Sequence, residues 1–200
     1  MEEFSLHKKR IEAKLDSILC NLIDMDDVGQ TTGVAERKTI LLTRALAAYC
    51  LIVVAHIEPK VAAAAVVDGG NDKGLDAIYI DQGSQTVFLV QSKWPSKIGK
   101  SISQAEVMKF CSGVSAVLKD EWDLINPKIE SMKAKLQAAV LDGATTFVTV
   151  LASPTTNLLE KHAEKEIAQL CSSLNAGMEP IVFRKDLNLT QLYGSLTSAF

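Results

Sequence analysis

Apolar residues recur at helical spacing over the first third of the chain. The pattern predicts an amphipathic helix from Glu3 to Ile23, because its apolar positions share one face at 3.6 residues per turn. A long apolar helix is then predicted from about Val34 to His56. A short alanine-rich helix follows from Lys60 to Val67, where Pro59 suits the first turn. The apolar positions of the first helix are Ile11, Leu15, Ile18 and Leu22.

The spacing of the apolar residues then changes to one that is typical of strands. The segments Leu75–Ile80 and Thr86–Lys93 are rich in β-branched and aromatic residues, which indicates two strands. Gly83-Ser84 between them is typical of a type II′ hairpin turn, which takes Gly at its first central position. With these two residues as the turn, Asp76 lies directly opposite Gln91.

The remainder of the chain alternates helices with strands. Ser103 and Glu106 have the spacing of a capping box and predict a helix start. Asn157 with Glu160 is interpreted as a second helix cap. The expected helices run through Val107–Leu118, about Leu124–Leu141, Leu159–Leu174 and Asn188–Phe200, and the expected strands are Thr145–Leu151 and Pro180–Phe183.

This order of elements defines the fold class. Three helices, two strands, two helices, and then a strand, a helix, a strand and a helix predict an α/β sandwich with a small mixed sheet flanked by helices. The length of 200 residues suits one domain with a sizeable core. We expect a single domain over 1–200, with N-terminal helices in 1–60 and an α/β core in 61–200.

The predicted hairpin gathers polar groups at its open end. Asp76 stands in a strand that is otherwise apolar, and a buried carboxylate is costly unless it is paired or bound to a metal. Directly opposed residues project on one face, so Asp76 and Gln91 share a face, with Lys93 diagonal to Asp76 on it. A register slip of one residue would separate Asp76 from Gln91.

This set of groups suits phosphodiester hydrolysis that depends on Mg²⁺ or Mn²⁺. Mg²⁺ prefers hard oxygen ligands, which Asp76, Gln91 and the backbone carbonyl of Ser92 would supply. Lys93 would orient or help to deprotonate the attacking water, or stabilise the charge that develops on the phosphate. Taken singly, each residue also has a structural interpretation: Asp76 as a turn cap, Lys93 as a surface charge, and Gln91 as incidental.

The residues form the pattern D-x14-Q-x-K in a hairpin, which resembles the PD-(D/E)xK nuclease superfamily in the variant where Gln replaces the second acid. The chain is similar, more closely, to the N-terminal nuclease-like region of the abortive-infection phage-resistance (AIPR) family. That resemblance rests on DGGNDKGLDAIYID at Asp68–Asp81, LVQSKW at Leu89–Trp94 and SISQAEVMKFCSGV at Ser101–Val114. The segment from FVTVLAS to the last helix is similar only loosely.

The resemblance implies a restriction-endonuclease-like fold and metal-dependent nucleic-acid cleavage in phage defence, with DNA favoured over RNA. Carried over residue by residue, it makes Asp76, Gln91 and Lys93 the catalytic core. Two further sets of acids stay open. Glu36 is the best-placed extra acid from a preceding helix, although the helix dipole alone also favours Glu at a helix start. Asp68 and Asp72 either bind a second ion or shape the Gly-rich turn.

The net charge and the length of the chain limit the interpretation as a nuclease. The net charge of -3 and the pI of about 5.7 exclude a general polyanion binder. The segment after the second strand is locally basic, however, and Trp94, Lys97 and Lys100 are expected to hold a nucleic-acid backbone and stack a base. Proteins of the family are usually much longer, so we expect a truncated piece, a short relative or a separate subunit.

The alternative function is a non-catalytic nucleic-acid sensor or protein-interaction module that keeps the nuclease fold. A homodimer is expected for duplex cleavage, because one compact site cuts one strand. The most apolar stretch is too closely bracketed by Arg44 and His56 for a membrane span. Isolated cysteines without CxxC spacing and the lack of a secretory pattern predict a reduced, cytoplasmic protein without a zinc site. The cysteines are Cys20, Cys50, Cys111 and Cys171.

Overall fold

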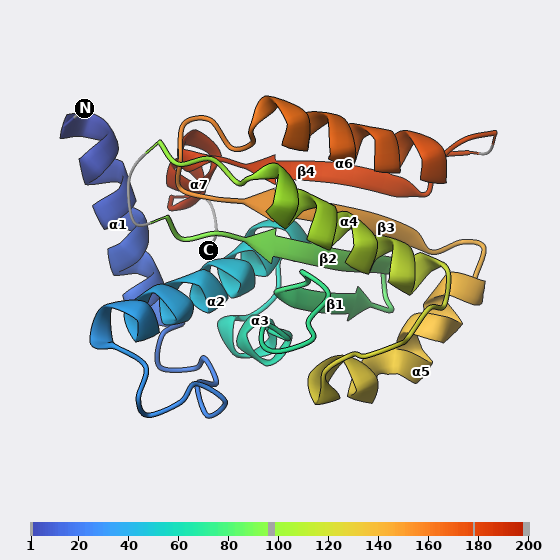
Figure 1. Cartoon of the computed structure of the whole chain (residues 1–200), viewed down its shortest axis with the longest axis horizontal. Helices are drawn as coiled ribbons and strands as arrows, with labels where there is room; N and C mark the ends of the chain where they lie inside the picture. The colour runs from blue at the N-terminus through green and yellow to red at the C-terminus, as the bar shows by residue number, and fades with distance from the viewer. Residues whose placement is uncertain (1, 96–98, 178, 198–200) are drawn as a thin grey trace.

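Two layers of helices enclose a four-stranded mixed sheet in the computed structural model, which describes residues 2–95, 99–177 and 179–197 (Figure 1). The predicted order of elements is confirmed throughout these residues. The helices are α1 (Glu2–Ile18), α2 (Val34–Ala55), α3 (Pro59–Ala64), α4 (Gln104–Leu118), α5 (Pro127–Leu141), α6 (Lys161–Leu174) and α7 (Leu189–Ser195). The strands are β1 (Ala77–Asp81), β2 (Thr86–Ser92), β3 (Thr146–Ala152) and β4 (Val182–Leu187).

The strands lie in the order β1-β2-β3-β4, so the sheet follows the chain. The β1/β2 hairpin is antiparallel, whereas β3 and β4 are added in parallel through α4, α5 and α6. Carboxyl ends of parallel strands meet at one edge, which is where open α/β sheets commonly hold ligands. The end of β2, with Gln91 and Ser92, therefore lies at the edge where a site is expected.

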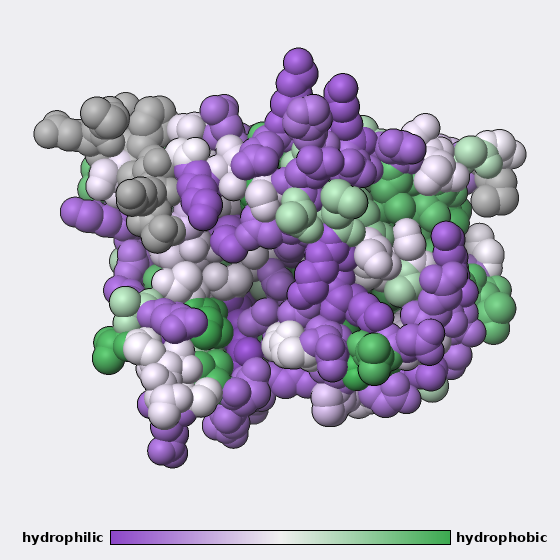
Figure 2. Space-filling model, viewed as in Figure 1, coloured by the Kyte–Doolittle hydropathy of each residue, from purple (hydrophilic) through white to green (hydrophobic). Residues whose placement is uncertain are grey.

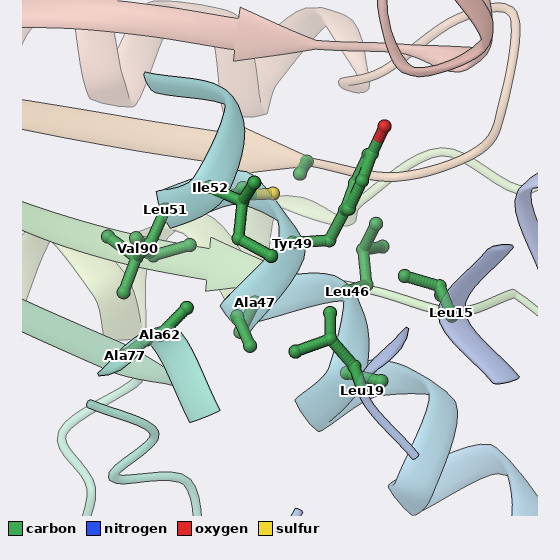
Figure 3. Packing of buried hydrophobic residues seen from close by; sticks show 14 of the residues in the cluster. Leu15, Leu19, Leu46, Ala47, Tyr49, Leu51, Ile52, Ala62, Ala77 and Val90 are labelled. Atoms are coloured by element: carbon green, nitrogen blue, oxygen red, sulfur yellow. The ribbon is translucent and has the colours of Figure 1, made fainter. Parts of the chain in front are cut away.

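Alternate residues of each strand belong to two different hydrophobic cores, because successive side chains point to opposite faces of the sheet. Phe88 and Val90 of β2 pack toward α1, α2, α3 and α7, and Figure 3 shows Val90 with Ala62, Ala77 and Leu51 in this layer. Val87 and Leu89 pack on the opposite face, in the core built with α4, α5 and α6. Gln91 continues the second series and therefore faces α4.

Helix α2 explains the apolar stretch in the sequence. Among the described residues it is the one helix whose length and composition are compatible with a membrane span. More than half of its most apolar window is buried inside the protein, where α2 packs across the sheet and against α1 and α3. This is the position of a core helix, and it is compatible with a soluble protein.

The predicted hairpin register is confirmed, but the predicted turn is wrong. Ala77 pairs with Val90 and Asp81 pairs with Thr86, which is the register that places Asp76 opposite Gln91. The ladder ends at Asp81, so the loop has four residues, and the positive φ falls on Gln85 at 48° instead of on the glycine. The Asp81 carboxylate accepts hydrogen bonds from the N–H groups at 83 and 84, which stabilises this longer turn.

Some strand and helix ends also differ from the expected ones. Asp76 lies just before β1 instead of inside a strand, and the strand expected over Pro180–Phe183 runs from Val182 to Leu187. The capping box of Ser103 and Glu106 at the start of α4 is confirmed. The expected cap at Asn157 is wrong, because α6 begins at Lys161 after Glu160, whose side chain makes no capping hydrogen bond. Helix α1 ends at Ile18 instead of Ile23, since the chain turns there through hydrogen bonds from the N–H groups of residues 19, 20, 22 and 23.

Candidate metal centre

The loop between α3 and β1 is closed at its base by the backbone. The N–H groups of Val67 and Asp68 both donate to the carbonyl of Asp76, at 2.9 and 3.1 Å. This closure brings Asp68 and Asp76 together, although eight positions separate them in the sequence. The segment from Asp68 to Asp76 is therefore called the aspartate loop below.

The third aspartate of this loop points back toward its base. Asp72 accepts hydrogen bonds from the N–H of Gly74 at 2.7 Å and from the N–H of Gly69 at 3.3 Å. One carboxylate oxygen from each of Asp68, Asp72 and Asp76 lies within 4.8 Å of the others. Three carboxylates at this spacing repel one another, and a divalent cation would relieve that repulsion.

Two glycines fasten the aspartate loop to α4. A Cβ on Gly113 would lie 2.4 Å from the carbonyl oxygen of Lys73 and would clash with it. Gly74 has a φ of 78°, and a Cβ there would lie 2.8 Å from the N of Phe110. The loop backbone thus contacts the helix backbone directly, which fixes the carboxylates relative to the side chains of α4.

Asp76 is the most constrained of the three aspartates. Its Oδ2 accepts hydrogen bonds from the backbone N–H of Ser92 at 2.6 Å and from the Ser92 hydroxyl at 3.2 Å. Burial raises the pKa of Asp76 well above its ordinary value, and the charges of Asp68 and Asp72 add to this effect against the hydrogen bonds from Ser92. Since the N–H and C=O of a strand residue point to the same side, the Ser92 carbonyl also faces β1.

Gln91 presents an oxygen without a hydrogen-bond partner. The side chain is 92% buried, and its Nε2 donates to the backbone carbonyl of Glu106 at 3.2 Å. Its Oε1 is one of two buried side-chain polar atoms among the described residues that make no hydrogen bond; the other is Oγ of Ser153, just beyond β3. A buried amide oxygen without a hydrogen-bond partner costs free energy. It therefore marks a position where a bound ligand would be stabilising.

Lys93 forms an ion pair with Glu106 in the first turn of α4. The other carboxylate oxygen of Glu106 accepts from the Ser103 N–H at 2.9 Å and from the Ser103 hydroxyl at 2.8 Å. Burial opposes ionisation of Glu106, but the hydrogen bonds from Lys93 and Ser103 outweigh it and lower the pKa of Glu106. Glu106 therefore contacts Lys93 through its carboxylate and Gln91 through its carbonyl.

The other two aspartates each have a cationic partner. The Nε of Arg44 donates to Asp68 at 2.7 Å, and its terminal nitrogens bind both oxygens of Asp27 at 2.6 and 2.7 Å. Lys109 Nζ lies 2.6 Å from Asp72 Oδ1. Asp76 makes no ion pair within the described residues.

The structure thus brings together the main residues expected from the sequence. Asp76, Gln91 and Lys93 lie at the carboxyl end of β2, and Ser92 lies beside them. Asp68 and Asp72 lie in the same acidic group. The residues expected to hold this site therefore come from one hairpin and the loop that precedes it.

Glu36 does not join this group. It is exposed in the first turn of α2, whereas the part of α2 that contacts the hairpin begins near Thr43, whose carbonyl accepts from the Ser92 hydroxyl. Two helical turns, roughly 10 Å along the axis, separate Glu36 from Thr43. Its position fits the helix-dipole interpretation.

The residues expected to bind nucleic acid are placed differently from one another. Trp94 is 95% buried in the core with α1 and α2, and Lys8 Nζ lies 5.1 Å from its ring centroid, so its face is not open to a base. Lys100 is exposed. Lys97 lies outside the described residues.

Three charged partners were not selected from the sequence as site residues. Arg44 was detectable as a charge inside an apolar helix, which requires a partner when buried. Glu106 is predicted from the sequence only as a helix cap, and Lys109 lies in the helix after the basic segment without a distinguishing pattern of its own. Sequence spacing alone does not show that α4 crosses the hairpin end.

Comparisons with protein-family models, with characterised proteins and with solved structures find no match to this chain.

The donors at this site fit a hard divalent cation. Carboxylates of the aspartate loop and the amide oxygen of Gln91 are oxygen ligands of the kind that Mg²⁺ and Mn²⁺ prefer. The buried, partnerless Oε1 of Gln91 is the observation of this structure that supports the fit. Asp76 and Gln91 would hold the ion, with the Ser92 carbonyl beside them.

Proposed function

We propose that this protein is a metal-dependent phosphodiester hydrolase that cleaves nucleic acid, with DNA favoured over RNA. The observation that carries the proposal is the shared face of Asp76, Gln91 and Lys93, where Gln91 Oε1 is buried without a partner. Among the described residues, the one other buried side-chain polar atom without a partner is Oγ of Ser153, so the unpartnered oxygen of Gln91 is exceptional.

The topology supports a more specific form of the proposal. An antiparallel hairpin followed by helices and a parallel strand is the arrangement expected for a restriction-endonuclease-like fold, which the sequence pattern resembles. We extend the proposal on that resemblance to the PD-(D/E)xK nucleases and, through the AIPR family, to a role in defence against phage.

The chemistry follows from the charges around the hairpin end. A bound Mg²⁺ or Mn²⁺ would polarise the phosphate and lower the pKa of a coordinated water. The Lys93 ammonium forms an ion pair with the Glu106 carboxylate. We therefore assign Lys93 to stabilising the charge that develops on the phosphate or to orienting the water, instead of acting as the base.

A second candidate is a nucleic-acid sensor that keeps the fold without cleaving. The observation that favours it is the presence of Arg44 and Lys109 on two of the three aspartates. These cations already neutralise much of the charge that would attract a metal. Hydrolysis therefore separates the two candidates.

The test is a cleavage assay with the purified chain. Plasmid DNA, single-stranded DNA and RNA are incubated with Mg²⁺, with Mn²⁺ or with EDTA. Asp76→Asn and Lys93→Met are compared with Asp81→Asn and Lys185→Met. The two controls change the same residue types on β1 and β4, away from the site.

We expect cleavage that requires the metal and falls about 100-fold or more in Asp76→Asn and Lys93→Met, the scale of losing a catalytic group. The two control variants should cleave at the parental rate. Retained cleavage in both site variants would contradict the assignment of the site. Binding of nucleic acid without cleavage under every condition would favour the sensor.

A further inference from the structure

A groove of about 290 Å³ lies beside the aspartate loop, between that loop and α4. The residues that line it, among those described, offer ammonium, amide and hydroxyl donors and include no acid. They are Asn71, Lys73, Lys109, Ser112 and Leu124. Such donors suit an oxyanion, and the face of the molecule that carries α4 is mainly hydrophilic (Figure 2). The groove therefore has the chemistry of a phosphate-binding site.

Lys109 belongs to this groove and to the acidic group at once. Its Nζ contacts Asp72 Oδ1 at 2.6 Å, while its side chain is 57% exposed and lines the groove. The Asp72 carboxylate is buried, with 8% of its side chain exposed, so loss of the ammonium would leave an uncompensated charge unless another cation takes its place. A long flexible side chain with an exposed head group can leave this carboxylate when a metal ion replaces it, and can then bind another anion.

Arg44, the other cation at the aspartates, cannot exchange in this way. It is 98% buried, and its guanidinium is held by Asp27, by Asp68 and by the backbone carbonyl of Asp24. Removing it would leave two carboxylates without their partner. Of the two cations, Lys109 is the one that can leave when a metal ion arrives.

The two glycine contacts keep both Asp72 and the groove within reach of the Lys109 side chain. Gly74 of the aspartate loop lies directly on the backbone at Lys109 and Phe110. The distance from the Lys109 backbone to Asp72, and from it to the groove, is therefore fixed by backbone packing. Movement of the lysine head group requires no movement of the helix or of the loop.

We propose that Lys109 couples divalent-metal binding at the aspartates to the binding of a nucleic-acid phosphate in the groove. This inference rests on the proposed function. Without metal, Lys109 neutralises Asp72; with metal at the aspartates beside Gln91 Oε1, the two cations repel each other and the lysine turns to a phosphate. Each ligand then strengthens the binding of the other by the same factor, because coupling free energies are reciprocal.

The test measures binding in the Lys93→Met background, so that hydrolysis does not consume the nucleic acid. The affinity for a short fluorescein-labelled single-stranded DNA is measured by anisotropy with and without Mn²⁺. The affinity for Mn²⁺ alone is measured by calorimetry. Lys109→Met is compared with Lys119→Met, which changes an exposed lysine at the end of the same helix.

We expect Mn²⁺ to strengthen DNA binding by about fivefold or more in the parent and in Lys119→Met. In Lys109→Met, Mn²⁺ alone should bind more tightly, and the effect of Mn²⁺ on DNA affinity should fall below about twofold. An unchanged Mn²⁺ effect in Lys109→Met would overturn the proposal.

Failure of this inference is distinguishable from failure of the proposed function. If Mn²⁺ binds, and Asp76→Asn weakens that binding, but Lys109→Met leaves the coupling intact, then the metal centre stands and the role of Lys109 is wrong. If Mn²⁺ does not bind, both are wrong. Cleavage by the parental chain is a separate readout that bears only on the proposed function.

Discussion

The backbone N–H of Ser92 donates a hydrogen bond of 2.6 Å to Oδ2 of Asp76, so the last residue of β2 holds the carboxylate that precedes β1. The Ser92 hydroxyl adds a second contact to the same oxygen. Both donors act on Oδ2, which leaves Oδ1 without a hydrogen bond from the described residues. The hairpin thus orients one oxygen and leaves the other without a donor.

Asp76→Asn should stabilise the protein at neutral pH while weakening metal binding. Because the pKa of Asp76 is raised in the folded state, its ionised form disfavours folding. The destabilisation is absent below the ordinary pKa of about 3.9, grows as the pH rises toward the raised pKa, and stays constant above it. Asparagine does not titrate, so Asp76→Asn should have the higher free energy of unfolding at neutral pH.

Urea unfolding of both proteins across the acidic to neutral range, without metal, measures this difference. The advantage of Asp76→Asn should shrink toward zero as the pH falls to about 3.9. A variant that is less stable than the parent at neutral pH would contradict the electrostatic account. Asp81→Asn is the matched control, because the pKa of Asp81 is lowered by its hydrogen bonds with Ser84.

Glu106→Gln should separate the capping role of Glu106 from its effect on Lys93. Glutamine also completes a capping box, so the free energy of unfolding should change by less than about 1 kcal/mol. The ion pair with Lys93 is lost, however, and the ammonium loses its fixed position. Cleavage should fall about tenfold or more, as expected when a charge-stabilising group is displaced.

The separate values of kcat and KM distinguish this positioning role from general damage. If Glu106 acts by holding the Lys93 ammonium, Glu106→Gln should lower kcat and kcat/KM by the same factor, because the lost interaction is made only in the transition state. A raised KM with kcat unchanged would contradict the positioning role.

Arg44→Met should be strongly destabilising. The substitution leaves Asp27 and Asp68 without the guanidinium that joins them, and breaking a buried ion pair costs about 3–5 kcal/mol. Partial exposure of the two aspartates places the expected loss near the lower figure. Lys38→Met, at a surface pair with Glu12, should leave the unfolding temperature nearly unchanged in the same thermal unfolding experiment.

Gly113→Ala should loosen the aspartate loop. The added Cβ would lie 2.4 Å from the carbonyl of Lys73, so the loop must shift, at a cost of about 1–3 kcal/mol. Mn²⁺ affinity should fall with stability, because the carboxylates move relative to α4. Gly143→Ala, whose Cβ would contact nothing within 4 Å, should leave both measurements unchanged.

Much of the fold and the central residues of the site were predictable because they depend on local patterns. The change of period from helix to strand located the hairpin. Its register was correct although the turn type was wrong, because the loop that forms is centred on the same two residues, Gly83 and Ser84. The register then placed Asp76 and Gln91 on one face without knowledge of any other element. Spacing within one hairpin was sufficient for this.

What the sequence did not predict depends on contacts between distant segments. Trp94 follows a strand end beside several lysines, and only the packing of α1 and α2 against it shows that it is a core residue. Glu106 and Lys109 contact the site because α4 crosses the hairpin end. The turn at Gln85 was missed because the Asp81 side chain favours a longer loop than Gly83 indicated.

The position of β1 at the edge of the sheet has a consequence for hydrogen exchange. An edge strand of five residues is expected to open more readily than β2 or β3, which are paired on both sides. An ion held jointly by Asp76 and Gln91 would clamp that edge strand to its neighbour and oppose local opening. Occupancy of the centre should therefore be visible as slower amide exchange along β1, even without substrate.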